Sequence, residues 1–142
     1  MDQVLSNCKI TKNLGEATAG TTTLTGSIVD MANFDDLVLM AVIGTKNTGN
    51  YMYIEHGDES DLSDAANVAD SKVTAAVNGE IVALEIVKPL KRYIRPYIVR
   101  GASSAVGTLM ALQRSCRGQP VDNNVSGTIV SETLISPISG TI

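Results

Sequence analysis

Apolar and polar residues alternate along much of this chain with a period of two, which is the pattern of half-buried β-strands. The longest apolar run extends from Leu37 to Ile43 and stops at Gly44. A run of this length predicts a strand that is buried on both faces. The loop TKNTGN (residues 45–50) then fits a hairpin turn into a next strand, NYMYIEHG. In that strand Tyr51, Tyr53 and Glu55 alternate with Met52, Ile54 and His56.

A second alternating stretch, KRYIRPYIVR (residues 91–100), combines cationic, aromatic and β-branched residues. As a strand it presents one face with Tyr93, Arg95, Tyr97 and Val99, and an opposite face with Arg92, Ile94, Pro96, Ile98 and Arg100. The four-residue link KPLK after EIVALEIV predicts a second hairpin. Because Pro96 cannot donate a ladder hydrogen bond, this strand is expected at an edge or at a bulge.

The remaining segments favour turns, short strands and extended arms. AANVADSKVTAAV (residues 65–77) is Ala-rich, and it is either a short helix or a loop with a short strand. Residues 1–20 and 121–142 show weak periodicity, so we expect an N-terminal arm and a C-terminal arm around a body at residues 21–120. Short strands at regular spacing without a βαβ rhythm predict an all-β fold, an antiparallel β-sandwich.

Composition supports one globular domain. The chain has 142 residues, of which 44% are hydrophobic, with one Phe and no Trp. It contains no apolar run of about 18 residues, and its first residues lack the features of a signal peptide, so we expect synthesis and retention in a cytosol and no membrane partner. Cys8 and Cys116 lack metal-type spacing and are expected to be reduced thiols.

Charge is divided between two parts of the chain. Residues 88–117 hold seven of the 11 Lys and Arg residues and no acid, whereas residues 30–85 hold eleven of the 15 acids. Such asymmetry predicts complementary surfaces, either for a partner or for another copy of the same chain.

Candidate catalytic and metal-binding residues are few. His56 is the only histidine, and its position predicts an ordinary surface side chain at a strand end. Glu55, Asp58, Glu59 and Asp61 offer oxygen ligands, but their spacing is not that of a calcium loop and is typical of a solvated acidic turn. We therefore expect no enzyme activity, no catalytic residues, no metal site and no cofactor.

The cationic strand is the main candidate for binding. Alternating Arg and Tyr could stack the bases of a single-stranded nucleic acid, or the strand could simply be exposed. Tyr and Arg are also preferred anchors of protein interfaces, and this interpretation is favoured over nucleic acid for an acidic chain. The candidate interface residues are Arg92, Tyr93, Arg95, Tyr97 and Arg100. We expect Ile94 and Ile98 to anchor the strand to the core.

The order of several short segments resembles the small cement or decoration proteins of tailed bacteriophages. The shared features are an Asp ahead of a Phe-Asp pair that opens an apolar strand, an acidic Ser-Asp turn, a KRYxR strand and a tail with Ser-Pro and Gly-Thr. They correspond here to Asp30 with Phe34 and Asp35, to Asp58–Asp61, to Lys91–Arg95 and to Ser136–Thr141. The resemblance covers roughly residues 20–142.

This resemblance implies a jelly-roll-like sandwich that forms a homodimer or homotrimer. It implies a location on the capsid surface of the virion, after synthesis in the host bacterial cytoplasm. There the protein would clamp neighbouring subunits of the major capsid protein, without enzyme activity, cofactor or nucleic acid. The alternative is a tail-associated or carbohydrate-binding β-sandwich module of a phage virion.

Overall fold

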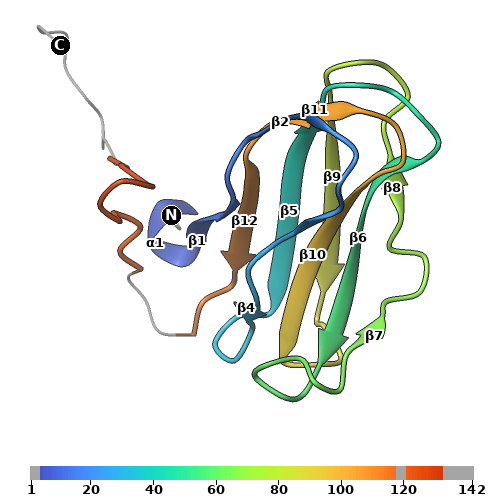
Figure 1. Cartoon of the computed structure of the whole chain (residues 1–142). Coiled ribbons are helices and arrows are strands. Elements are labelled where there is room, and N and C mark those ends of the chain that lie inside the picture. The colour runs from blue at the N-terminus through green and yellow to red at the C-terminus, as the bar shows by residue number, and fades with distance from the viewer. Residues whose placement is uncertain (1–3, 118–120, 133–142) are drawn as a thin grey trace, which may run out of the picture.

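The computed structural model describes residues 4–117 and 121–132, and nearly all regular structure in this part of the chain is β-strand. The strands form two antiparallel sheets that face each other, as Figure 1 shows. The predicted all-β antiparallel sandwich is therefore confirmed. The only helix among the described residues is one turn, α1 (Val4–Asn7).

Within the described residues, each sheet contains six strands, which come from distant parts of the chain. Sheet A consists of β1 (Lys9–Leu14), β2 (Ala17–Gly20), β5 (Asp36–Ile43), β9 (Glu80–Val87), β11 (Ser104–Val106) and β12 (Leu109–Arg114). Sheet B consists of β3 (Leu24–Thr25), β4 (Val29–Asp30), β6 (Asn50–Gly57), β7 (Ala66–Asn67), β8 (Val73–Thr74) and β10 (Tyr93–Arg100).

The core lies between the sheets and is built from alternate residues of the long strands. Its largest fully buried aliphatic side chains are Leu37, Leu39, Ile43, Met52, Ile54, Ile94, Ile98 and Leu109. On β5 the intervening residues Val38, Met40 and Val42 are only half-buried. The expectation that this strand is buried on both faces was therefore wrong, because only its inner face lies in the core.

The two predicted hairpins are instead crossovers between the sheets. β5 and β9 belong to sheet A, whereas the strands that follow them, β6 and β10, belong to sheet B. An alternating pattern requires only that one face of the strand is buried. This requirement is met whether the next strand lies in the same sheet or in the opposite one, so the pattern does not tell a hairpin from a crossover. This alternation of successive long strands between sheets is the jelly-roll-like feature of the connectivity.

β10 is an inner strand, so the edge position was wrong, whereas the alternative of a bulge fits the register, in which residues 26–28 lie opposite residues 95 and 96. It pairs with β6 along its whole length, and β4 and β3 pair with its two ends on the other side. Pro96 lies in the break between β4 and β3, where the N–H of Gly26 donates to the Pro96 carbonyl at 2.8 Å. The N–H that proline lacks is therefore missing at a position where no neighbouring strand would accept a hydrogen bond from it.

The predicted N-terminal arm is, from Lys9 onward, part of sheet A. β1 pairs with β12, and β2 pairs with β11. Backbone pairing, rather than a strong apolar pattern, holds these strands, which is why the sequence pattern did not reveal them. The buried Asn13 side chain adds a link, because it accepts from the N–H of Ser27 and donates to its carbonyl.

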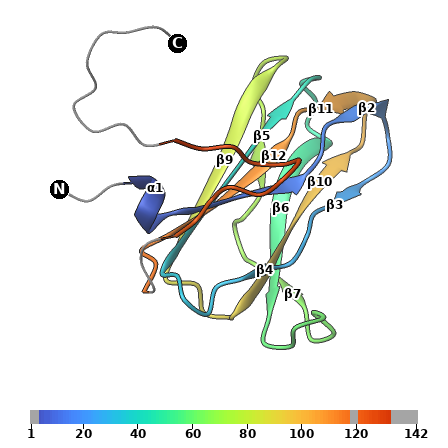
Figure 2. The same ribbon diagram turned by 90° about the vertical axis from the view of Figure 1, so that its left-hand side faces the viewer.

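The described part of the predicted C-terminal arm, residues 121–132, lies beside α1 and β1 (Figure 2) and folds back on itself at an antiparallel bridge between Val125 and Ile129. The buried Asn123 side chain accepts from the N–H of Ile10 at 2.7 Å and donates to the carbonyls of Leu5 and Cys8 at 2.8 Å. Amide hydrogen bonds thus tie residue 123 to the segment of residues 5–10. Residues 133–142 of this arm lie outside the described residues.

Residues 65–77 adopt the loop-with-short-strands alternative. They contain β7 and β8, which pair with β6, and the rest is turn or irregular structure. Asp70 has a positive φ of 60°, which a continuous helix does not allow. Among the described residues, none of the helical structure is long and apolar enough to cross a membrane.

Candidate protein interface on the outer face of sheet B

All four tyrosines of the chain lie on the outer face of sheet B. Tyr51 and Tyr53 come from β6, and Tyr93 and Tyr97 come from β10. The register places Tyr53 directly opposite Tyr97 and Glu55 opposite Arg95. Because side chains alternate along both strands, the neighbouring positions point into the core, and the Tyr and Arg side chains are left half-buried on one surface.

The aromatic rings on this tyrosine face hold one another in place. The rings of Tyr53 and Tyr97 are stacked, with centroids 5.1 Å apart and planes 11° apart. Tyr51 lies 6.1 Å from Tyr53, and the Lys72 ammonium lies 4.2 Å from the Tyr51 centroid. Such contacts order the side chains before a partner arrives, which lowers the entropy cost of binding.

Glu55 connects the cationic and aromatic residues. Its Oε1 accepts hydrogen bonds from Nε and Nη2 of Arg95 at 2.8 and 2.6 Å, and from the hydroxyl of Tyr97 at 2.6 Å. The side chains of Arg95 and Glu55 are only 26% and 13% exposed, so solvent screens this ion pair less than a surface pair. Burial, together with the hydrogen bond to Glu55 and its charge, raises the pKa of Tyr97.

Arg92 and Tyr93 form a more exposed rim at the start of β10. The Arg92 guanidinium makes a bidentate contact with Asp30 at 2.9 and 3.0 Å, and it lies 5.0 Å from the Tyr93 centroid. The hydrogen bond from Arg92 holds the pKa of Asp30 below its ordinary value. About half of each charged side chain is exposed, so this pair contributes little to stability.

Arg100 does not belong to the exposed face, and its assignment as an interface residue needs correction. It is 5% exposed and points inward. Its guanidinium donates to the carbonyls of Thr22, Thr18 and Ser104 at 2.7, 2.8 and 2.9 Å, and to the hydroxyl of Thr22 at 2.7 Å. The alternation of β10 directs this cation into the sandwich, where it links the 18–22 segment to β11.

Five of the seven basic residues of the 88–117 segment form ion pairs with carboxylates of the same chain. The pairs that the structure contains are Lys91 with Asp58, Arg92 with Asp30, Arg95 with Glu55, Arg114 with Asp36 and Glu85, and Arg117 with Asp35. The acidic middle and the basic segment are therefore complementary to each other inside one molecule. A second molecule is not required to explain their separation along the sequence.

Sequence reasoning identified half of the tyrosine face. It placed Tyr93, Arg95 and Tyr97 on one surface, and the structure does so. It did not join Tyr51 and Tyr53 to them, because the pairing of β6 with β10 cannot be derived from two separate alternating patterns. The alternation of Tyr51 and Tyr53 was the only signal available.

The other predicted residues show structural roles. His56 is half-buried in β6, opposite Ile94 of β10. In the acidic turn, the Asp64 carboxylate accepts from the N–H groups of Asp58 and Glu59. Within residues 4–117 and 121–132, no three His, Cys, Asp or Glu side chains form a group that could hold a metal ion. Cys8 is buried and Cys116 is half-buried, and the two are not joined by a disulfide.

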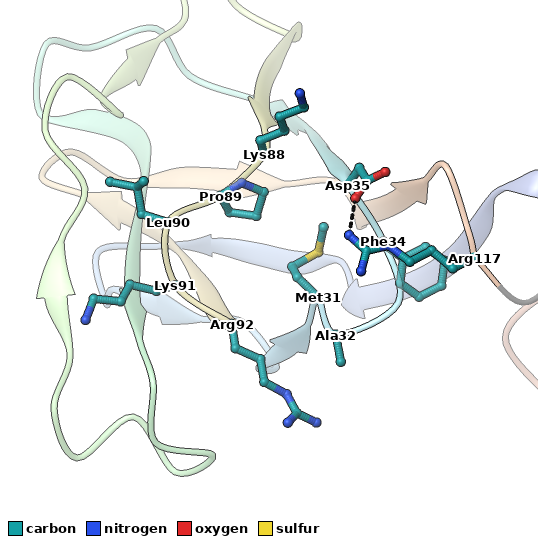
Figure 3. Close-up of a pocket in the computed structure, with 10 residues that line it drawn as sticks. All are labelled: Met31, Ala32, Phe34, Asp35, Lys88, Pro89, Leu90, Lys91, Arg92 and Arg117. Carbon is teal, nitrogen blue, oxygen red and sulfur yellow. Dashed lines mark hydrogen bonds and ion pairs between the residues drawn. The ribbon is translucent and has the colours of Figure 1, made fainter.

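Two hollows open on the surface near this face. One, of about 450 Å³, lies beside Tyr51 and Tyr53 and is also lined by Asn67, Val68, Asp70, Ser71, Lys72 and Val99. The other, of about 530 Å³, lies at the end of the sandwich between the 31–35 and 88–92 segments. Figure 3 shows the second, with Met31, Phe34 and Pro89 toward its interior and Arg117 reaching across to Asp35.

Comparison of the sequence with protein-family models finds no matching family, and comparison with curated proteins finds no matching sequence.

Proposed function

We propose that this chain is a cement or decoration protein that binds the outer surface of a tailed-phage head and clamps neighbouring subunits of the major capsid protein. The tyrosine face carries the proposal. Tyr and Arg are enriched where protein interfaces concentrate their binding energy, and the face places Tyr51, Tyr53, Tyr97 and Arg95 side by side on adjacent strands. The order of sequence segments shared with decoration proteins supports the same assignment.

The geometry suits a protein that binds without chemistry. The rings and the Arg95–Glu55 pair are already ordered, so little side-chain entropy is lost on contact. A protein that bridges two capsid subunits binds only the assembled arrangement and therefore stabilises it by linkage. Repetition of a modest contact across the lattice then protects the shell against the outward pressure of packaged DNA.

A binding and heating experiment tests this proposal. Phage heads that lack the protein are incubated with the purified chain, sedimented and then heated while DNA release is followed with an intercalating dye. We expect the native chain to cosediment at a saturable ratio and to raise the temperature of DNA release. Absence of binding to heads at saturating concentrations would contradict the proposal.

The hollow beside Tyr51 favours a second candidate, a carbohydrate-binding module of the virion. Asn67, Asp70 and Ser71 line it with groups that can hydrogen-bond to sugar hydroxyls. However, sugars usually stack on free ring faces, whereas Lys72 lies over Tyr51 and Tyr97 stacks on Tyr53. Binding of the native chain to a glycan array, with loss in Tyr51→Ala, would favour this candidate over the capsid.

A further inference from the structure

β9 is a long edge strand with an unused side. It pairs with β5 from Glu80 to Val87, and in the part of the chain that the structure describes no backbone hydrogen bond joins residues 81–87 to any other strand. β8 approaches it but does not pair with it. A row of backbone N–H and C=O groups is therefore open to another strand.

The sequence of β9 lacks most of the devices that protect such an edge, although it keeps two charged residues, Glu80 and Glu85. Natural edge strands carry Lys, Pro or bulges, but EIVALEIV has none of these residues, and its register with β5 is unbroken. Ile81 and Val87 are each 64% exposed on the outer side. On the inner side, Leu84 and Ile86 are only partly buried at the margin of the core. Apart from Glu80 and Glu85, this edge is apolar on both faces.

We propose that β9 pairs antiparallel with β9 of a second copy, about a two-fold axis at Leu84, so that sheet A continues through a homodimer. Paired residues in a sheet share a face, so only registers that match inner with inner and outer with outer residues are allowed. The register centred on Leu84 places Leu84 opposite itself and Val82 opposite Ile86 on the inner face. On the outer face it places Ile81 opposite Val87 and Ala83 opposite Glu85.

Charge selects this register among the neighbouring ones. Centring on Glu85 would place the two Glu85 carboxylates directly opposite each other, which is destabilising. Centring on Ala83 would place Glu85 opposite Ile81 and Glu80 opposite Ile86, so acidic residues would face apolar ones. Only the Leu84-centred register keeps the apolar residues together and gives each Glu85 the small, uncharged Ala83 as its neighbour. The self-complementary pattern is the reason to assign a second copy as the occupant.

Two substitutions at Ala83 test the register, because Ala83 is exposed in the monomer. Ala83→Lys would face Glu85 of the partner and should tighten the dimer, whereas Ala83→Glu would face the same carboxylate and should weaken it. Each contact occurs twice by symmetry, so the dissociation constants should move by about two- to thirtyfold in opposite directions. The measurement is sedimentation equilibrium of the full chain over a range of concentrations.

Val77→Lys and Val77→Glu are the matched controls. Val77 is 57% exposed and lies outside β9. The two Val77 variants change the net charge by the same amounts as the two Ala83 variants, but their dissociation constants should equal that of the native chain. Hydrogen exchange of residues 81–87 should also slow as the concentration of the native chain rises. A native chain that stays monomeric at all concentrations, or Ala83 variants that dimerise alike, would overturn the proposal. This proposal does not depend on binding to a phage head, so the two can fail separately.

Discussion

At the scale of single residues, two arginines of the same strand have opposite roles. Arg95 is half-buried on the outer face and is paired with Glu55, whereas Arg100 lies in the sandwich and donates to three backbone carbonyls. The sequence assigned both to one candidate interface. Their difference follows from the alternation of side chains along β10, which directs residue 95 to the outer face and residue 100 into the sandwich.

Replacement of Arg100 should therefore be a stability defect. Arg100→Met leaves the carbonyls of Thr18, Thr22 and Ser104 without their donor, and we expect a loss of about 3–5 kcal/mol in the free energy of unfolding, measured with urea. Arg92→Met is the matched control, because its partly exposed pair with Asp30 should contribute less than about 1 kcal/mol. If the two variants lose equally little free energy of unfolding, the guanidinium of Arg100 is not needed for the fold.

Titration of the tyrosines tests the role of Glu55. Burial and the Glu55 carboxylate raise the pKa of Tyr97, so the folded state keeps this proton to a higher pH than the unfolded state. The stability that this provides is present below the ordinary tyrosine pKa of about 10 and is lost as the pH rises above it. Glu55→Gln should move the phenolate absorbance transition of Tyr97 back toward that value. An unchanged transition would exclude Glu55 as a cause.

At the scale of elements, the sequence predicted strands well and their neighbours poorly. The alternation of β6, β9 and β10 located each strand and separated its inner from its outer residues. It could not distinguish a hairpin from a crossover, because both bury one face of each strand. Weakly patterned strands such as β1 and β2 were predicted as an arm, since their pairing depends on backbone groups that every sequence carries.

The packing of neighbouring strands requires a glycine at position 26. A Cβ at this position would lie 2.2 Å from Oδ1 of Asn13 and 2.6 Å from Cγ of Pro96. Gly26→Ala should therefore cost about 1–3 kcal/mol of stability by forcing β10 and its neighbours apart. Gly15→Ala is the control, since the nearest atom to its Cβ would be 3.8 Å away, and it should have little effect. Thermal unfolding of both variants compares them directly.

At the scale of the whole molecule, the two sheets offer two different surfaces. The outer face of sheet B presents ordered tyrosines, and the β9 edge of sheet A presents open backbone groups. In the proposed homodimer, the two tyrosine faces would remain available for two separate partner contacts. This combination would allow one dimer to bridge neighbouring capsid subunits.

Arg95→Ala should weaken binding to phage heads by about 1–3 kcal/mol while the domain remains folded, because it removes a cation from the centre of the tyrosine face. Lys91→Ala, at the more exposed pair with Asp58, should change binding much less. Cosedimentation isotherms measure both, and circular dichroism confirms the fold. If Arg95→Ala binds heads as tightly as the native chain, the strand is an ordinary exposed one.

The most direct measurement is a cryo-microscopy map of phage heads decorated with this chain. We expect density for the β-sandwich on the outer surface across a joint between capsid subunits. Tyr51, Tyr53 and Tyr97 of sheet B would contact the capsid protein in that map. A map in which the sandwich is bound but the tyrosine face points to solvent would contradict the assigned interface, and heads that show no added density would contradict the proposed function.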